Sequence, residues 1–118
     1  MILYFPALCI GDNWQEKYNS LDEVEDTIVF WGMTLGKSFV ESIWDFNVYD
    51  VIGGYTGDVL IMHGTDDEIV TLSYSEKATE FYSNCQLVVM DKEGHGFGAE
   101  GGKTARENVL NFMNEHIE

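Results

Sequence analysis

The chain has 118 residues, of which 45% are hydrophobic, and a formal net charge of −15 because it carries 6 Lys and Arg against 21 Asp and Glu. This length allows one modest domain with one core, and the hydrophobic content favours a folded chain over a disordered one. Nucleic acid and anionic membrane surfaces repel a chain this acidic, so we expect neither as a partner.

The two cysteines, Cys9 and Cys85, predict free thiols rather than a disulfide framework. They lie far apart in the sequence, and neither belongs to a C-x-x-C pair. This usage is typical of a reducing compartment. We see no basic signal-peptide region and no apolar run of membrane-spanning length. We therefore expect a cytoplasmic protein in which both cysteines are packing residues.

The first half of the chain predicts a buried strand followed by a segment rich in aromatic residues. Residues 2–6 form an apolar run that ends at a proline, as a buried strand and its exit would. Residues 11–26 are polar and acidic and predict a loop or short helix, and residues 27–31 are a β-prone run. From Leu35 apolar residues recur at helical spacing until a glycine pair at 53–54.

The second half alternates strand, helix, strand and helix with short connections. Residues 59–62 and 87–90 are continuous apolar runs, which are typical of strands buried on both faces, and they predict strands near residues 58–63 and 86–90. An S-x-x-E capping box predicts a helix that begins at Ser73, and the glycine pair at 101–102 introduces a last amphipathic helix. Together with the run at 2–6, this alternation predicts an α/β fold with about three parallel strands and flanking helices.

Two residues that suit acid–base chemistry follow the two strands of the second half. Asp67 comes after the strand predicted at 58–63, and His95 comes after the strand predicted at 86–90. Neighbouring parallel strands end at the same edge of a sheet, so both side chains should emerge close together. A carboxylate beside an imidazole fixes the ring tautomer and makes the histidine a general base. The spacing alone also fits an ordinary turn aspartate and a histidine beside glycine.

Other arrangements of polar residues are less favoured. Residues 32–38 resemble a phosphate loop but have three residues between the glycines, where four are needed. His63, Asp67 and His95 are the residue types of a two-His-one-carboxylate metal site. We favour a packed structural role for His63, which ends a strand, and we expect no metal and no cofactor.

Several strings in the chain resemble the C-terminal half of an α/β-hydrolase: HGTDDEIV, the helix start SYSEKA, LVVMDKEGHGF and the closing amphipathic helix. In that superfamily the acid follows the seventh strand as H-G-x-x-D-x-x-V, and the histidine follows the eighth as G-H-G. The match assigns the acid to Asp67, not Asp66, and the base to His95. The opening LYFPALCI resembles the sixth strand and its exit.

The stretch FWGMTLGKSFVESIWDFNVYDVIGGYTG resembles the lid insertion of the cinnamoyl or feruloyl esterase-like branch. The resemblance implies one incomplete α/β-hydrolase domain over residues 1–118, with a lid-like insertion at roughly 11–52. It also implies a serine hydrolase that acts on small carboxylic esters, including hydroxycinnamoyl esters. Trp31, Phe39 and Trp44 could then line an aromatic acyl pocket, or could simply pack the lid onto the sheet.

The nucleophile of such an enzyme is missing from these residues. The superfamily carries its serine in a G-x-S-x-G elbow, and this chain has no such motif; the nearest serine, Ser38, lacks the second glycine and falls in a predicted helix. We therefore expect a chain that supplies the acid and histidine but is inactive alone. A non-catalytic interaction or pseudo-enzyme module, and a peptidase or acyltransferase of the same fold, remain alternatives.

The first strand carries the prediction about partners. In the hydrolase architecture it pairs with the strand that holds the nucleophile, so here its apolar edge would be unpaired. An exposed edge invites pairing with another chain. We expect it to bind the missing N-terminal half or a second copy of this chain.

Overall fold

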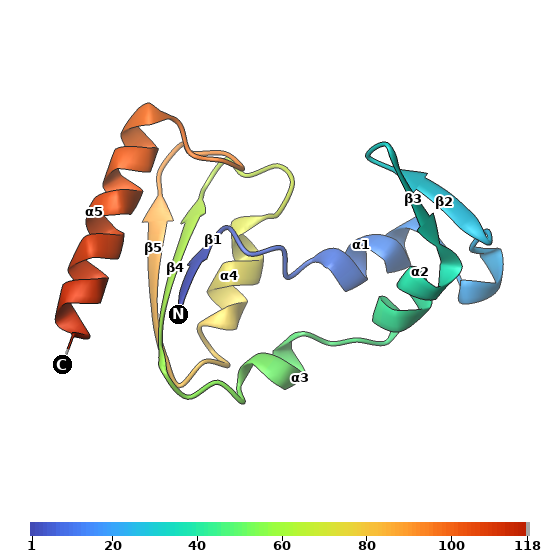
Figure 1. The fold of residues 1–118 in the computed structure, drawn as a ribbon, viewed down its shortest axis with the longest axis horizontal. Coiled ribbons are helices and arrows are strands. Elements are labelled where there is room, and N and C mark those ends of the chain that lie inside the picture. The colour runs from blue at the N-terminus through green and yellow to red at the C-terminus, as the bar shows by residue number, and fades with distance from the viewer. Residues whose placement is uncertain (118) are drawn as a thin grey trace. The chain divides into compact units, whose positions relative to one another are not determined.

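The computed structural model describes residues 1–117, which form two compact units. Of the described residues, one unit consists of residues 1–8 together with 49–117, and the other consists of Cys9–Val48. Figure 1 traces the chain from one unit into the other and back.

The first unit is built on a sheet of three parallel strands. These are β1 (Ile2–Tyr4), β4 (Asp58–Gly64) and β5 (Asn84–Met90), in the order β1-β4-β5. The strands lie where the apolar runs predicted them, within two residues at each end, and the predicted three-stranded parallel sheet is confirmed. Helices flank it, as the α/β alternation requires (Figure 1).

The position of β4 in the centre of the sheet explains why its residues 59–62 are all apolar. Val59, Leu60, Ile61 and Met62 are each at most 1% exposed. β4 is paired on both edges and covered on both faces, so its side chains pack against other side chains whichever face they point to.

Each face of β4 is covered by a different helix. Leu60 and Met62 pack against α5 (Ala99–Glu115) in a core cluster with Met90, Ala105 and Phe112. Successive side chains of a strand point to opposite faces, so His63 lies on the other face. There it contacts Ser75 of α4 (Leu72–Ala78), which covers that face.

Both helices begin earlier than the sequence predicts. α4 begins at Leu72, and its start has no side-chain cap; the Ser73 hydroxyl instead bonds the Thr71 hydroxyl at 2.8 Å. The capping-box prediction is therefore wrong. α5 begins at Ala99 and contains the glycine pair within its first turns. At Gly101 a Cβ would collide with the Glu93 side chain, so this glycine serves close packing rather than a helix boundary.

The second unit, Cys9–Val48, has its own small core. Its helices are α1 (Ile10–Lys17) and α2 (Lys37–Trp44), and its strands are β2 (Thr27–Phe30) and β3 (Met33–Gly36); a short 3-10 helix, η1, spans Leu21–Glu23. The buried core residues are Trp14, Val24, Ile28 and Val40.

The hairpin β2–β3 corrects one prediction. The sequence predicts a single β-prone run and then a helix from Leu35, but Leu35 pairs with Ile28 in β3, and the helix begins at Lys37. The connection consists of Trp31 and Gly32, both with positive φ, at 51° and 74°. Two consecutive left-handed residues are the signature of a tight two-residue hairpin turn.

The chain returns to the sheet through α3 (Tyr49–Ile52). The Tyr49 hydroxyl donates a hydrogen bond to the Tyr74 carbonyl at 3.0 Å, and the Lys77 ammonium lies 4.4 Å from the centre of the Tyr49 ring. Tyr49 thus packs α3 onto α4. Across residues 1–117, no helix combines the length and apolar character that crossing a membrane requires.

Candidate functional site

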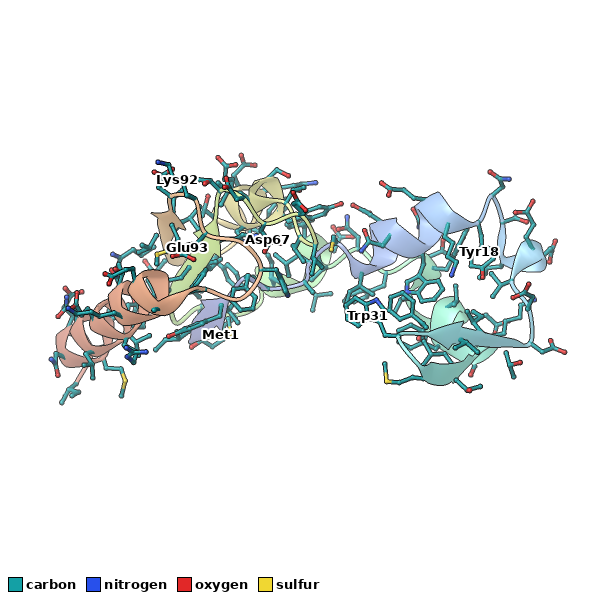
Figure 2. All side chains as sticks on the ribbon, turned by 90° about the horizontal axis from the view of Figure 1, so that it is seen from above. Met1, Tyr18, Trp31, Asp67, Lys92 and Glu93 are labelled. Atoms are coloured by element: carbon teal, nitrogen blue, oxygen red, sulfur yellow. The ribbon has the colours of Figure 1, made fainter. Side chains whose placement is uncertain are left out.

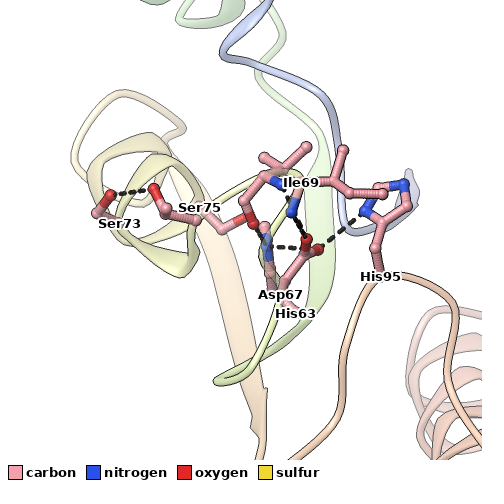
Figure 3. Close-up of polar contacts among 8 residues, drawn as sticks. His63, Asp67, Ile69, Ser73, Ser75 and His95 are labelled. Atoms are coloured by element: carbon pink, nitrogen blue, oxygen red, sulfur yellow. Dashed lines mark hydrogen bonds and ion pairs between the residues drawn. The ribbon is translucent and has the colours of Figure 1, made fainter.

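The loop that follows β4 holds Asp67 in a fixed position. Asp67 is 5% exposed, and its Oδ1 accepts hydrogen bonds from the backbone N–H groups of Ile69 at 3.0 Å and Val70 at 2.8 Å (Figure 3). An aspartate that caps its own turn in this way orders the loop. The second carboxylate oxygen, Oδ2, remains for other partners.

His95, on the loop that follows β5, is one of those partners. Its Nδ1 lies 2.9 Å from Asp67 Oδ2, and its side chain is 30% exposed (Figure 3). Because a carboxylate only accepts hydrogen bonds, Nδ1 carries the hydrogen and donates it. Nε2 of the neutral ring is then the basic nitrogen, which is the tautomer that a general base needs.

The environment of Asp67 favours its ionised form. Burial raises the pKa of Asp67, but the hydrogen bonds from the Val70 N–H, His95 and the Ile69 N–H, with the charge of His95, outweigh burial and lower that pKa below its ordinary value. Hydrogen bonds to a carboxylate stabilise its charge in this way. Asp67 is therefore a fixed negative charge beside His95 at neutral pH.

Backbone bonds beyond the strand ends tie the two loops together. The Thr65 N–H donates to the Met90 carbonyl at 3.0 Å, and the Asp66 N–H donates to the Glu93 carbonyl at 2.9 Å. The Lys92 N–H donates to the Thr65 Oγ1 at 2.8 Å. Figure 2 shows Glu93 near Asp67, with Lys92 on the same loop as Glu93. The strand register therefore continues into the loops and sets the distance between the acid and the histidine.

Gly64, at the end of β4, makes this close approach of the two loops sterically allowed. A Cβ at Gly64 would overlap the Glu93 carbonyl group, which is backbone and has little freedom to move. A glycine is required wherever two backbones come this close. The close approach of the two loops thus explains why the second residue of the His63-Gly64 pair is a glycine.

A second histidine, His63, lies on the other side of Asp67. Its ring is fully buried, with Nδ1 2.6 Å from the Ser75 Oγ and Nε2 2.7 Å from the Val70 carbonyl oxygen. Nε2 is also 3.2 Å from Asp67 Oδ2 (Figure 3). The sequence predicts a packed structural residue at this position. It does not predict the hydrogen bond between His63 and Ser75, and the available signal for the contact between His63 and Asp67 is their spacing of four residues.

An aromatic contact on His95 also escapes the sequence analysis. The rings of Phe5 and His95 have centroids 4.5 Å apart, and Phe97 meets Phe5 edge-on at 5.2 Å. Phe5 has φ of 34°, an unusual backbone conformation for a bulky residue and one that concentrates at functional sites. Its N–H still bonds the Met62 carbonyl at 2.8 Å, so the ring is presented directly from the end of β1.

The three aromatic residues predicted to bind substrate all lie in the Cys9–Val48 unit. Trp31 is 76% exposed and stacks on Phe30, Phe39 meets Trp14 edge-on at 5.9 Å, and Trp44 packs against the core of that unit. Their role in a substrate pocket stays a prediction.

The two other arrangements of polar residues gain no support from the geometry. In the stretch that resembles a phosphate loop, Gly32 lies in the β2–β3 turn and Met33–Gly36 form strand β3, so no loop is present between the two glycines. Ser38 lies in α2, where the sequence predicts a helix. No three His, Cys, Asp or Glu side chains within the described residues are grouped so that they could hold a metal ion.

Solved structures resemble this chain, although no family model and no curated protein matches it. Est1E from Butyrivibrio proteoclasticus superposes with a TM-score of 0.84 and 28% identity, over 97% of this chain and 49% of Est1E. Est1E with ferulic acid bound gives a TM-score of 0.82 at 28% identity, over 97% and 48%. A mutant of the meta-cleavage product hydrolase CumD from Pseudomonas fluorescens IP01, complexed with acetates, gives 0.57 and 26% over 69% and 29%.

These matches identify the architecture. The three-stranded parallel sheet with its flanking helices is part of an α/β-hydrolase fold, and the chain spans about half the length of Est1E.

Proposed function

We propose that this partial α/β-hydrolase fold supplies the acid and the histidine of a Ser-Asp-His triad in a carboxylic-ester hydrolase. The observation that carries the proposal is the 2.9 Å contact between His95 Nδ1 and Asp67 Oδ2, at the edge where two parallel strands end. The carboxylate holds the imidazole in the Nδ1–H tautomer. His95 Nε2 accepts the proton of the serine as it attacks the ester carbonyl, and then returns it to the leaving alcohol.

In this proposal the nucleophile comes from outside these 118 residues, which hold no G-x-S-x-G motif. Ser75 contacts His63, which in turn contacts the acid, but it does not fit the role. It is 0% exposed and meets Nδ1 of a ring that is itself fully buried, so no ester can reach its hydroxyl. The serine elbow and the oxyanion donors would belong to the other half of the fold.

Two features of the described residues suit docking of that half. β1 pairs with β4 on one edge, and no strand of residues 1–117 pairs with its other edge. α5 and the residues just beyond it also expose an apolar flank formed by Leu110, Met113 and Ile117, which are 59%, 49% and 69% exposed and three or four residues apart. We propose that a strand of the nucleophile-bearing half pairs with β1 and that this half also covers the α5 flank.

The likeness to Est1E, which has been solved with ferulic acid bound, supports hydroxycinnamoyl esters as the proposed substrate class. Hydroxycinnamoyl esters are therefore the first esters to test, beside short-chain esters. In this proposal Trp31, Phe39 and Trp44 contact the planar acyl group by stacking.

The test is complementation. The purified chain is mixed or co-expressed with the portion of Est1E that it does not match, and hydrolysis of a short-chain chromogenic ester and of a hydroxycinnamate ester is measured. We expect activity only in the mixture, and we expect His95→Ala or Asp67→Asn to abolish it. His116→Ala is the matched control. His116 Nδ1 forms a hydrogen bond with the Phe112 carbonyl at the end of α5 and makes no hydrogen bond with Asp67, His63 or His95.

The other outcomes separate the alternatives. A complex that forms without activity supports a non-catalytic interaction module. Activity of the chain alone, abolished by His95→Ala, would reveal a nucleophile within these residues and overturn the proposal. Turnover of peptide or acyl-transfer substrates in preference to esters would favour a different chemistry of the same fold.

A further inference from the structure

His63 is a buried titratable residue that the proposed mechanism does not use. It belongs to β4, it is 0% exposed, and each of its ring nitrogens meets a polar atom: Ser75 Oγ at Nδ1, and the Val70 carbonyl and Asp67 Oδ2 at Nε2. A packed residue needs only to fill its space. This ring instead joins α4, the acid loop and the acid itself.

The surrounding atoms determine which nitrogen carries the hydrogen. Nε2 lies 2.7 Å from the Val70 carbonyl oxygen and 3.2 Å from Asp67 Oδ2. Both oxygens can only accept hydrogen bonds, so Nε2 must donate. The Ser75 hydroxyl, 2.6 Å from Nδ1, can donate to that nitrogen. The neutral Nε2–H tautomer therefore satisfies all three contacts, and no buried side-chain polar atom among the described residues lacks a hydrogen-bond partner.

Val70 links this ring to the acid. Its carbonyl accepts from His63, and its N–H donates to Asp67 Oδ1 at 2.8 Å. Holding Val70 therefore holds Oδ1, and the nearby Nε2–H attracts Oδ2 from the side opposite His95. Rotation of the carboxylate about its χ2 angle away from His95 would therefore break these contacts.

We propose that His63, as its Nε2–H tautomer, is a positioning residue that aims Asp67 Oδ2 at His95 Nδ1. The inference rests on the proposed function for the roles of the acid and the base, and it adds a third member behind them. His63 touches no substrate in this arrangement, and it acts only through Val70 and Asp67.

The first test is made on the unaltered chain by NMR. Two-bond proton–nitrogen correlations of the 15N-labelled imidazoles show which nitrogen carries the hydrogen, and the chain has three histidines to assign. The spectra are recorded at a pH above which the imidazole signals no longer change, so that the neutral rings are observed, and we expect Nε2–H for His63 and Nδ1–H for His95. A hydrogen on Nδ1 of His63 would overturn the proposal, whatever the variants do.

The second test is a matched pair of substitutions. In His63→Gln the side-chain amide reaches the position of Nε2 and can donate to the Val70 carbonyl. In His63→Asn it is one methylene shorter and reaches Ser75 but not Val70. We expect the Gln variant to keep the Nδ1–H pattern of His95 and the Asn variant to lose it, as Asp67→Asn does. Folded variants that both keep the pattern, or both lose it, would contradict the proposal.

Ser75→Ala completes the design. It removes the donor to Nδ1 and leaves the Nε2 contacts in place, so we expect the His95 tautomer to stay unchanged; loss of the Nδ1–H pattern would instead assign the aiming to Ser75. All these readouts come from the chain alone. If complementation fails while the tautomers are as expected, only the proposed function is overturned. If complementation succeeds while the tautomers differ from those expected, only the role of His63 is overturned.

Discussion

His95 Nδ1 lies 2.9 Å from Asp67 Oδ2, although the two residues are 28 positions apart in the chain. The distance is set by the parallel pairing of β4 with β5 and by the backbone bonds that continue it into the loops, such as Asp66 N–H to the Glu93 carbonyl. The acid is buried and the histidine is partly exposed. The pair therefore presents the basic nitrogen of His95 to solvent, while the carboxylate of Asp67 is shielded from solvent.

The ionised state of Asp67 gives the fold a defined pH dependence. Because the pKa of Asp67 is lowered in the folded chain, its carboxylate stabilises the fold above the ordinary aspartate range, and this stabilisation is lost as pH falls through the folded-state value. We expect Asp67→Asn to lose about 1–3 kcal/mol at neutral pH, because buried N–H donors lose a charged acceptor. The variant should also weaken less than the unaltered chain on acidification.

Urea unfolding at a series of pH values measures both effects. Asp66→Asn is the control, because Asp66, next to Asp67, is exposed. The unfolding curve of this variant should follow that of the unaltered chain. Parallel loss of stability with falling pH in the unaltered chain and in Asp67→Asn would contradict the argument.

The contact between the two loops predicts an asymmetry between two glycines. Gly64→Ala places a methyl group against the Glu93 carbonyl, so we expect a loss of about 1–3 kcal/mol as the loops separate. Gly102→Ala, within α5, meets nothing closer than the end of the Arg106 side chain at 3.7 Å, and should gain about 0.5–1 kcal/mol from helix propensity. Thermal or urea unfolding of both variants checks the signs. Equal effects would mean that the loops can move apart freely.

The sequence predicts the sheet well because its signal is local. The apolar runs at 59–62 and 87–90 are long enough to mark buried strands, and parallel strands that end together bring the loops of Asp67 and His95 to one edge. The hairpin strand β3 was missed because its turn, Trp31–Gly32, lacks the usual Asn-Gly or Asp-Gly signature.

Features that depend on contacts between elements were not predictable from the sequence. The early start of α5 depends on Glu93, whose carboxylate accepts the Gly98 N–H at 2.9 Å and whose side chain packs at Gly101. The role of His63 depends on which face of β4 meets α4, and a run buried on both faces carries no alternation to reveal that. The positive φ of Phe5 likewise has no sequence signal, because a residue before proline favours extended backbone with negative φ.

The ring of Phe5 should restrain His95 in the free chain. Phe5→Leu removes the aromatic contact at a centroid distance of 4.5 Å, so the His95 ring protons should lose the chemical-shift displacement that a neighbouring aromatic ring causes. In the complemented enzyme, kcat should fall several-fold because the base becomes mobile. Tyr4→Leu is the control, since Tyr4 contacts Phe5 and Phe97 rather than His95. If the His95 chemical shifts are unchanged in a folded Phe5→Leu chain, Phe5 does not restrain His95.

The open edge of β1 can be blocked without disturbing the sheet. Met1 and Phe5 bond β4 through the Met1 carbonyl and the Phe5 N–H. Because alternate residues of an edge strand direct their backbone groups to opposite sides, the N–H of Tyr4 points away from β4. Tyr4→Pro therefore removes a hydrogen-bond donor from the open edge and adds bulk there, while leaving the bonds to β4 intact.

We expect Tyr4→Pro to fold with the circular dichroism of the unaltered chain and to lose both association with the nucleophile-bearing half and the resulting esterase activity. Size exclusion with light scattering, at several concentrations, follows both that association and self-association of the chain. Tyr4→Ala removes the same ring but keeps the N–H, so it should still assemble. If Tyr4→Pro assembles as well as Tyr4→Ala, the partner does not add a strand at β1, and the apolar flank of α5 becomes the docking surface to test by Leu110→Lys.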